Sequence, residues 1–235
     1  MGKSFFCLLF IVFWQLGVSQ NKLVYLFPGQ GSDAAIFSKL ELKNCDTVVI
    51  NYPIPTKKDL LPSYAKRLMS QIDTTHPFYF LGVSFGGMNA IEISKIIKPE
   101  KLIIISSAKG SKEIPFRYKF QRVVPMYNLF TGRFYKRMAK LARPIVEPDS
   151  REYDSIFRAM IDRKNPDFMK RSIKMICKWK NKENPTTIIH IHGELDHTIP
   201  FRKVDSTYKI ENGSHMMVYT KAQELNELLN KILNE

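Results

Sequence analysis

The chain has 235 residues and a formal net charge of +14, and 44% of its residues are hydrophobic and 12% aromatic. These values indicate one ordinary globular domain with a sizeable core, and the sequence contains no repeat or low-complexity stretch. Its 3 cysteines exclude a disulfide framework, and we expect Cys45 and Cys177 to be unpaired thiols.

Residues 1–19 have the pattern of an export signal. Lys3 precedes an apolar run, Phe5 to Trp14, and small residues at Gly17 and Ser19 favour cleavage before Gln20. The run has about half of the roughly 20 residues that a membrane-spanning helix needs. We therefore expect a mature domain over residues 20–235 that is periplasmic or secreted. An uncleaved N-terminal membrane anchor is the alternative.

Strands alternate with helices in most of the mature chain. Continuous apolar runs predict strands at 23–27, 47–50, 78–83, 102–106 and 186–191, with a weaker one at 207–210. The spacing of apolar residues predicts helices over 58–72, 87–97 and 221–233. This order is typical of the α/β class, with a mostly parallel sheet covered by helices on both faces. Functional groups should then lie at the carboxyl ends of the strands.

The first motif at a strand end is Gly82-Val83-Ser84-Phe85-Gly86-Gly87. A predicted strand precedes it and a predicted helix follows it, which is the context that G-x-S-x-G requires. A strained turn lifts the Ser84 hydroxyl clear of the sheet, and the flanking positions must lack bulk. The helix N-terminus favours negative charge there. The motif predicts that Ser84 is a nucleophile.

The second motif is IIHIHGELDHTIP, residues 188–200. A strand ends at His192-Gly193, and Asp196 follows in the loop. A carboxylate at this position can orient a histidine and stabilise its charged form. The histidines at 190, 192 and 197 also suggest a metal site, but their spacing matches no familiar zinc pattern, and we expect no metal.

The third motif is KIENGSHMMVY, residues 209–219. His215 lies in a Gly-Ser loop between the last strand and the last helix. A lone histidine is usually structural. Because Ser84, Asp196 and His215 follow one another in this order at strand ends, His215 becomes a candidate general base.

These three motifs resemble those of the α/β-hydrolase superfamily, and the resemblance covers nearly all of the mature chain outside residues 109–182. It implies that Ser84 is the nucleophile, His215 the base and Asp196 the residue that orients the base, with no metal or cofactor. Glu194 is an alternative acid in the same loop. Asp46 and Asp205 follow no comparable pattern.

The predicted mechanism also needs donors for an oxyanion. The backbone N–H groups of Gln30 and Phe85 are the candidates. Pro28-Gly29 occupies the place where many members of the superfamily have His-Gly. If Gln30 acts through its main chain, Gln30→Ala should matter far less than Gln30→Pro.

The stretch FPGQGS, residues 27–32, also resembles the opening motif of acyl-carrier acyltransferases. The rest of the chain conflicts with that family, because it has no F-H-S segment and too few residues between Gln30 and Ser84 for the larger architecture. We therefore interpret the stretch as part of the oxyanion hole. Acyl transfer itself stays open, because hydrolysis and transfer share an acyl-enzyme.

The positive charge is concentrated between two of the predicted strands. Residues 109–182 contain 20 Lys and Arg against 7 Asp and Glu, a net charge of +13, whereas the rest of the mature chain contains 15 of each and is neutral. In the superfamily this is the usual place for a helical cap over the active site. Two stretches have apolar residues at helical spacing, namely Leu129, Phe130, Phe134, Met138 and Leu141, and Phe168, Ile173, Ile176 and Trp179.

Three interpretations of this basic cap are open. In the first, its apolar faces pack on the body of the domain and its charges are solvated. In the second, it is a lid that lines an acyl pocket and has a basic rim. Such a rim would attract an anionic substrate or a membrane surface. Nucleic-acid binding is the third, but no nucleic-acid motif accompanies the charge and we expect none.

The sequence thus predicts an exported serine hydrolase that acts on a carboxylic ester or thioester. Its substrate is expected to be a small or lipid-like acyl compound. The rival prediction is a non-catalytic protein of the same fold that uses the basic cap to bind anionic lipids or a partner.

Overall fold

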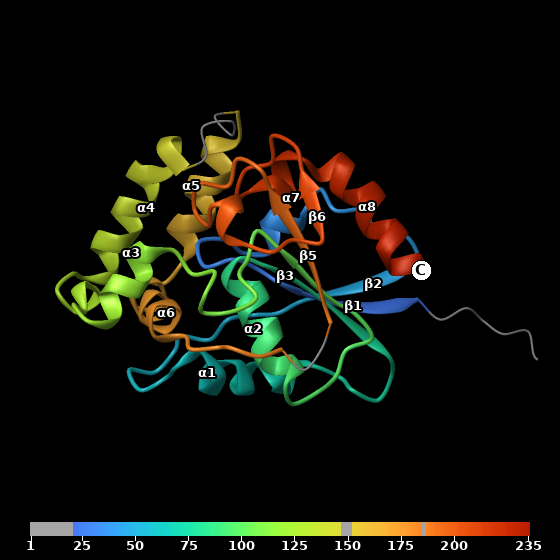
Figure 1. The fold of residues 1–235 in the computed structure, drawn as a ribbon, viewed down its shortest axis with the longest axis horizontal. Coiled ribbons are helices and arrows are strands. Elements are labelled where there is room, and N and C mark those ends of the chain that lie inside the picture. The colour runs from blue at the N-terminus through green and yellow to red at the C-terminus, as the bar shows by residue number, and fades with distance from the viewer. Residues whose placement is uncertain (1–20, 147–151, 185–186) are drawn as a thin grey trace, which may run out of the picture.

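A computed structural model of the chain describes residues 21–146, 152–184 and 187–235 (Figure 1). Its centre is a six-stranded sheet in the order β2-β1-β3-β4-β5-β6, and all neighbouring strands are parallel. The strands are β1 Lys22–Phe27, β2 Cys45–Val49, β3 Phe78–Val83, β4 Leu102–Ile105, β5 Ile188–Gly193 and β6 Tyr208–Ile210. The prediction of a parallel α/β sheet is confirmed. The predicted export signal lies outside the described residues.

The sheet is buried on both faces. Leu102 and Ile104 of β4 belong to one apolar core, together with α1 (Leu61–Leu68) and α2 (Phe85–Ser94). Their neighbours Ile103 and Ile105 belong to a second core with α8 (Ala222–Asn234). Because successive strand residues point to opposite faces, a strand between two helix layers is apolar at every position. Figure 1 shows α1 and α2 below the sheet and α8 above it.

Several predicted boundaries shift by a few residues. Helix α1 begins at Leu61, with Pro62 in its first turn, and ends at Leu68 before a 3₁₀ turn at Met69–Gln71. Helix α2 begins at Phe85, directly after Ser84, so its N-terminus lies at the proposed nucleophile. Strand β5 extends to Gly193, two residues further than the apolar run. The body also contains a short helix, α7, at Met217–Thr220.

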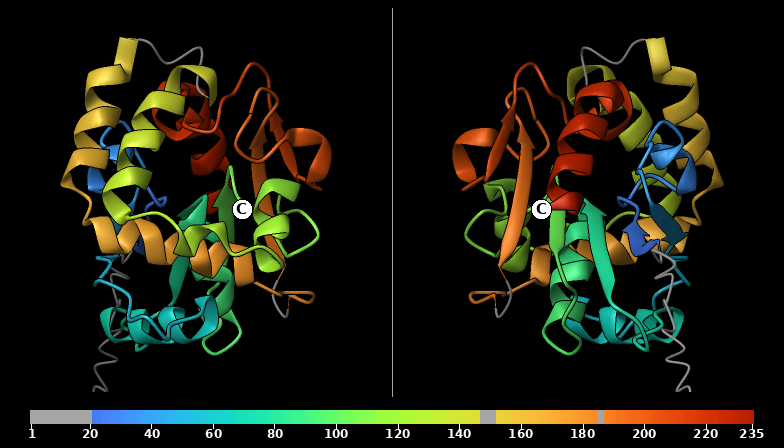
Figure 2. Two further views of the ribbon diagram at one scale, coloured as in Figure 1. Left: turned by 90° about the vertical axis from the view of Figure 1, so that its left-hand side faces the viewer. Right: turned by 90° about the vertical axis from the view of Figure 1, so that its right-hand side faces the viewer.

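The basic segment forms a helical cap between β4 and β5. It contains a short α3 (Phe116–Lys119), two 3₁₀ turns at Phe120–Arg122 and Met126–Asn128, and three longer helices. These are α4 (Gly132–Val146), α5 (Asp154–Arg163) and α6 (Pro166–Lys178). Figures 1 and 2 show the cap beyond the carboxyl ends of the strands.

The two apolar faces predicted for the cap have different environments. Phe168 and Ile176 of α6 are buried in the core beneath the sheet, and so is Trp179, whose Nε1 donates to Glu92 Oε1 over 2.7 Å. By contrast, Leu129 and Leu141 are 74% and 57% exposed. The interpretation that the apolar faces of the cap pack on the body therefore holds for α6. It does not hold for the stretch from Leu129 to Leu141, whose outer side faces solvent.

Two further findings concern membrane-spanning helices and the cysteines. No helix in the described parts of the chain is long and apolar enough to cross a bilayer. Cys45 and Cys177 are both free thiols, as expected. Burial raises the pKa of the Cys177 thiol to about 12, so this cysteine stays protonated at neutral pH.

Candidate active site

Ser84 lies on a strained turn between β3 and α2. Its φ of 54° is positive, a conformation that non-glycine residues rarely adopt. The turn is held by a hydrogen bond from Ser84 N to Ile105 O at 2.9 Å. A Cβ at Gly82 would approach Gly87 Cα to 2.6 Å, and one at Gly86 would approach Phe27 O to 2.0 Å. Both glycines are required by close backbone approach, as the motif predicts.

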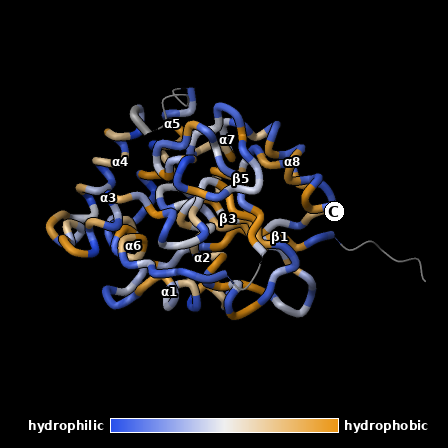
Figure 3. Tube along the Cα trace, viewed as in Figure 1, coloured by the Kyte–Doolittle hydropathy of each residue, from blue (hydrophilic) through white to orange (hydrophobic). Residues whose placement is uncertain are grey.

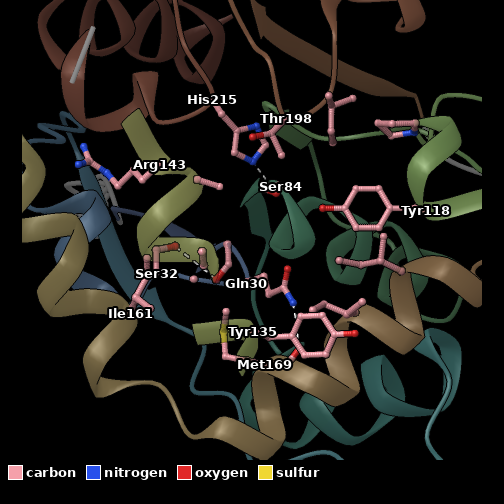
Figure 4. A pocket seen from close by; sticks show the side chains of 18 of the residues that line it. Gln30, Ser32, Ser84, Tyr118, Tyr135, Arg143, Ile161, Met169, Thr198 and His215 are labelled. Atoms are coloured by element: carbon pink, nitrogen blue, oxygen red, sulfur yellow. Dashed lines mark hydrogen bonds between the residues drawn. The ribbon is translucent and has the colours of Figure 1, made fainter. Parts of the chain in front are cut away.

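The structure brings Ser84, His215 and Asp196 together from three separate loops. His215 Nε2 lies 2.9 Å from Ser84 Oγ, and His215 Nδ1 lies 2.7 Å from Asp196 Oδ2. An ionised carboxylate only accepts hydrogen bonds, so Nδ1 must carry a proton. In a neutral imidazole, Nε2 then has a lone pair that faces the Ser84 hydroxyl. Figure 4 shows this pair at the edge of a pocket.

The Asp196 carboxylate is buried and fully partnered. Its Oδ1 accepts from the backbone N–H groups of Thr198 and Ile199, each at 2.8 Å. Burial alone would raise the pKa of this carboxyl, but the charge of His215 and hydrogen bonds from His192 and His215 outweigh it and hold the pKa below its usual value. Asp196 is therefore ionised over the whole physiological range.

Two buried histidines extend this hydrogen-bond chain behind Asp196. His192 Nε2 lies 2.8 Å from Ile199 O and 3.3 Å from Asp196 Oδ2, so it carries the proton. His192 Nδ1 then accepts from His190 Nε2 at 3.0 Å. Burial above all, together with the neighbouring His192 and Lys109, lowers the pKa of His190 to about 3. Both rings fit neutral imidazoles that support Asp196.

The alternative residues lie elsewhere. Glu194 is exposed and its Oε1 is 3.4 Å from Lys209 Nζ. Asp205 pairs with Lys109 at the surface, and Asp46 accepts from Asn21. None of these three carboxylates contacts His215. Among the described residues, no group of His, Cys, Asp and Glu side chains is arranged to hold a metal ion.

The two candidate oxyanion donors flank Ser84 in the fold. Phe85 is the first residue of α2, so its N–H has no acceptor within the helix. Gln30 lines the same pocket as Ser84 and follows the end of β1. The side chain of Gln30 points to the cap, where its Nε2 donates to Ser172 Oγ at 2.8 Å and to Met169 O at 3.1 Å. Only its main chain is available to a reacting carbonyl.

A pocket of about 580 Å³ leads to Ser84 and His215. The body contributes its floor, and the cap contributes walls, with Tyr118 and Ile161 on opposite sides in Figure 4 and Tyr135 and Met169 between them. Arg143 also lines the pocket, but it pairs with Asp154 and lies over the Phe157 ring at 4.5 Å. The wall is mostly apolar and aromatic, which suits an acyl chain.

Several residues of this site were not predicted from the sequence. Tyr118 and Tyr135 lie on the pocket wall although they are separated in the chain, and no motif surrounds either of them. His192 was noted only as a metal candidate. The helical spacing of apolar residues in the cap did indicate part of the wall, because Met138, Ile173 and Ile176 of the two predicted stretches line the pocket.

Comparisons with known proteins show likeness at the level of fold. The chain matches no family model and no curated protein sequence. Among solved structures, it is similar to MenH from S. aureus, with a TM-score of 0.70 and 17% identity over 93% of this chain and 95% of that one.

Two further solved structures are similar over nearly their whole length. For the enol-lactonase from Burkholderia xenovorans LB400, the TM-score is 0.69 at 14% identity, covering 92% of each chain. For a thermophilic esterase from Thermogutta terrifontis, it is 0.68 at 12% identity, covering 92% of this chain and 90% of that one. At such low identities the likeness establishes the fold only.

Proposed function

The chain has the α/β-hydrolase fold, and we propose that it is a serine hydrolase that cleaves a carboxylic ester or thioester. The observation that carries the proposal is the hydrogen-bond chain from Ser84 through His215 to Asp196, which ends at a pocket with a mostly apolar wall. The names of two similar structures, an esterase and an enol-lactonase, agree with this reaction class.

Acylation would begin with attack of Ser84 Oγ on the substrate carbonyl carbon. His215 Nε2 takes the hydroxyl proton, and the ionised Asp196 stabilises the imidazolium that forms. The negative charge that develops on the carbonyl oxygen is met by the N–H groups of Gln30 and Phe85. When the tetrahedral intermediate collapses, the bond to the leaving group breaks, and His215 returns the proton to the departing alkoxide or thiolate.

Deacylation would repeat these steps with water as the nucleophile. His215 removes a proton from the water while its oxygen attacks the acyl carbon of the Ser84 ester. Collapse of the second intermediate releases the carboxylic acid and returns the proton to Ser84 Oγ. The cycle gains and loses no proton or electron, so Ser84, His215 and Asp196 suffice for its proton transfers.

The test is turnover of p-nitrophenyl esters by the wild-type protein and two serine variants. Ser84→Ala should abolish turnover and leave the fold intact. Ser106→Ala is the matched control, because Ser106 also follows a strand at positive φ, 48°, and its Oγ has no hydrogen-bond partner among the described residues. We expect wild-type turnover from the control. Equal loss in both variants would contradict the proposed role of Ser84.

The pocket wall adds a second readout to this test. Each methylene that moves from water into an apolar pocket contributes about 0.8 kcal/mol, or roughly fourfold in kcat/KM. We therefore expect kcat/KM to rise with acyl chain length until the pocket is filled. A non-catalytic binding protein, the rival function, would bind such esters without turning them over.

We also propose that the protein is exported. The support is the sequence pattern of residues 1–19, with its cleavage point before Gln20. N-terminal sequencing of the protein recovered from the cell surface, periplasm or medium tests this proposal. A mature chain that begins at Gln20 would support it, whereas an intact N-terminus would favour a membrane anchor.

A further inference from the structure

The cap presents an unusually apolar surface to solvent. We call the exposed side chains between Phe116 and Leu141 the cap surface. Within it, Phe116 is 70% exposed, Val123 83%, Leu129 74% and Leu141 57%. Figure 3 shows hydrophobic colour along the outer loop between α3 and α4, at the left edge of the molecule. Exposed apolar side chains gathered in one part of a globular domain mark a contact with another molecule or with a membrane.

The same stretch is positively charged. Residues 116–141 contain 7 Lys and Arg and no Asp or Glu. Arg133 and Arg137 of α4 are exposed, and neither forms an ion pair with a described carboxylate. Lys140 does pair with a carboxylate, Asp162 of α5, at 2.8 Å. Exposed apolar side chains in the same stretch as exposed arginines are the pattern of a surface that enters an anionic lipid interface.

The cap surface adjoins the pocket that contains Ser84. Arg117, Tyr118 and Gln121 line the pocket from the α3 side, and Tyr135 and Met138 line it from α4. Met138 is also 41% exposed, so one side chain belongs both to the pocket wall and to the cap surface. A molecule that covers the cap surface therefore lies beside the route into the pocket.

We propose that the cap surface docks on an anionic lipid bilayer and that the substrate is an acyl lipid drawn from that bilayer. Exposed apolar side chains such as Val123 and Leu129 enter the interface, while Arg133 and Arg137 contact headgroup phosphates. The identity of the substrate rests on the proposed hydrolase function, but the docking itself does not.

Charge favours the lipid over two other occupants. A second copy of the chain would bring one strongly cationic stretch against another, which costs free energy at close range. The chain's own apolar run, Phe5 to Trp14, contains no acidic residue that would neutralise the cations. An anionic bilayer matches both the apolar and the charged components of the surface.

The experiment is vesicle co-sedimentation of the full mature chain carrying Ser84→Ala, so that no turnover affects binding. We expect partitioning onto phosphatidylcholine vesicles that contain phosphatidylglycerol, and much weaker partitioning onto phosphatidylcholine alone. Each basic residue near an anionic surface contributes roughly fivefold to the partition coefficient. Arg133→Gln with Arg137→Gln should therefore lower it roughly 30-fold, and added salt should lower it further.

The matched control for charge is Lys43→Gln with Lys98→Gln, which removes two exposed lysines outside the cap. For the apolar component, Val123→Ser with Leu129→Ser should lower the partition coefficient roughly tenfold or more. Ile54→Ser with Ile96→Ser, which changes exposed apolar residues of the body, is the corresponding control. Both controls should partition like the parent protein.

Three results would overturn the docking proposal. They are equal partitioning onto both kinds of vesicle, wild-type partitioning of both cap variants, or self-association that the cap variants abolish while vesicles are not bound. The hydrolase proposal is tested separately, with protein that has Ser84 intact. It fails if this protein does not turn over a soluble ester. The cap variants should keep wild-type turnover of that soluble ester, because their residues do not line the pocket.

Discussion

Asp196→Asn inverts the hydrogen bonding that orients His215. Oδ1 of Asp196 accepts from two backbone N–H groups, those of Thr198 and Ile199. In the variant the amide oxygen must take this place, because an NH₂ group there would face two donors. The NH₂ group of the new asparagine then faces His215 Nδ1, which becomes the acceptor. The proton of the imidazole moves to Nε2, and Nε2 can no longer take a proton from Ser84.

The loss can be estimated from two contributions. At an effective dielectric of about 20, two unit charges about 4 Å apart attract by about 4 kcal/mol, and this attraction between Asp196 and the imidazolium disappears. The charge-assisted hydrogen bond of 2.7 Å between the two residues is also lost, which adds about 1.5 to 3 kcal/mol. The sum of about 6 kcal/mol corresponds to a fall in kcat of roughly 10⁴-fold, the size seen for this change in serine proteases.

The assay is the pre-steady-state acylation rate with a p-nitrophenyl ester, measured alongside the free energy of unfolding. Glu194→Gln is the matched control, because Glu194 lies in the same loop and is exposed, and its side chain lies 3.4 Å from Lys209 Nζ. We expect the control to stay within about twofold of the wild-type rate. A loss below about tenfold in Asp196→Asn, or an equal loss in Glu194→Gln, would refute the assigned roles.

Two further predictions concern the surroundings of the site. Gln30→Pro removes a proposed oxyanion donor and should lower kcat by about 10²-fold or more, whereas Gln30→Ala should lose only the bonds to Met169 and Ser172, about 1 to 2 kcal/mol of unfolding free energy. Equal kcat values for these two variants would contradict the assignment. The pKa of His190 is about 3 in the folded chain and about 6.5 in the unfolded chain. Between these two pH values only the unfolded chain binds the proton, so the free energy of unfolding falls by about 1.4 kcal/mol for each pH unit of acidification. In denaturant titrations His190→Gln should lack this part of the pH dependence, and an unchanged slope would disprove the buried neutral state.

The sheet and the three loop motifs were predictable because both depend on local sequence. Strands buried on two faces are apolar at every position, as Leu102 to Ile105 show. The turn at Ser84 requires glycines at Gly82 and Gly86, where a Cβ would collide with backbone. Parallel strands bring the loops that follow them to one edge of the sheet, so their order in the chain suggested that Ser84, Asp196 and His215 meet.

The cap was predictable only in part, because helical spacing does not say which way a helix faces. The two stretches of the cap have the same mixture of apolar and basic residues, yet Phe168 is buried and Leu129 is exposed. The difference comes from contacts between distant elements, such as the bonds from Gln30 to α6. The role of His192 behind Asp196 likewise depends on a three-dimensional contact that its strand does not reveal.

Labelling with a fluorophosphonate probe, followed by peptide mapping, shows directly whether Ser84 is an activated nucleophile. The probe phosphonylates a serine only when a base activates its hydroxyl, so it reports the Ser84–His215 pair without any assumption about the substrate. We expect a single labelled peptide that contains Ser84, with labelling lost in Ser84→Ala and kept in Ser106→Ala. Folded wild-type protein that takes up no label, or that is labelled at another serine, would contradict it.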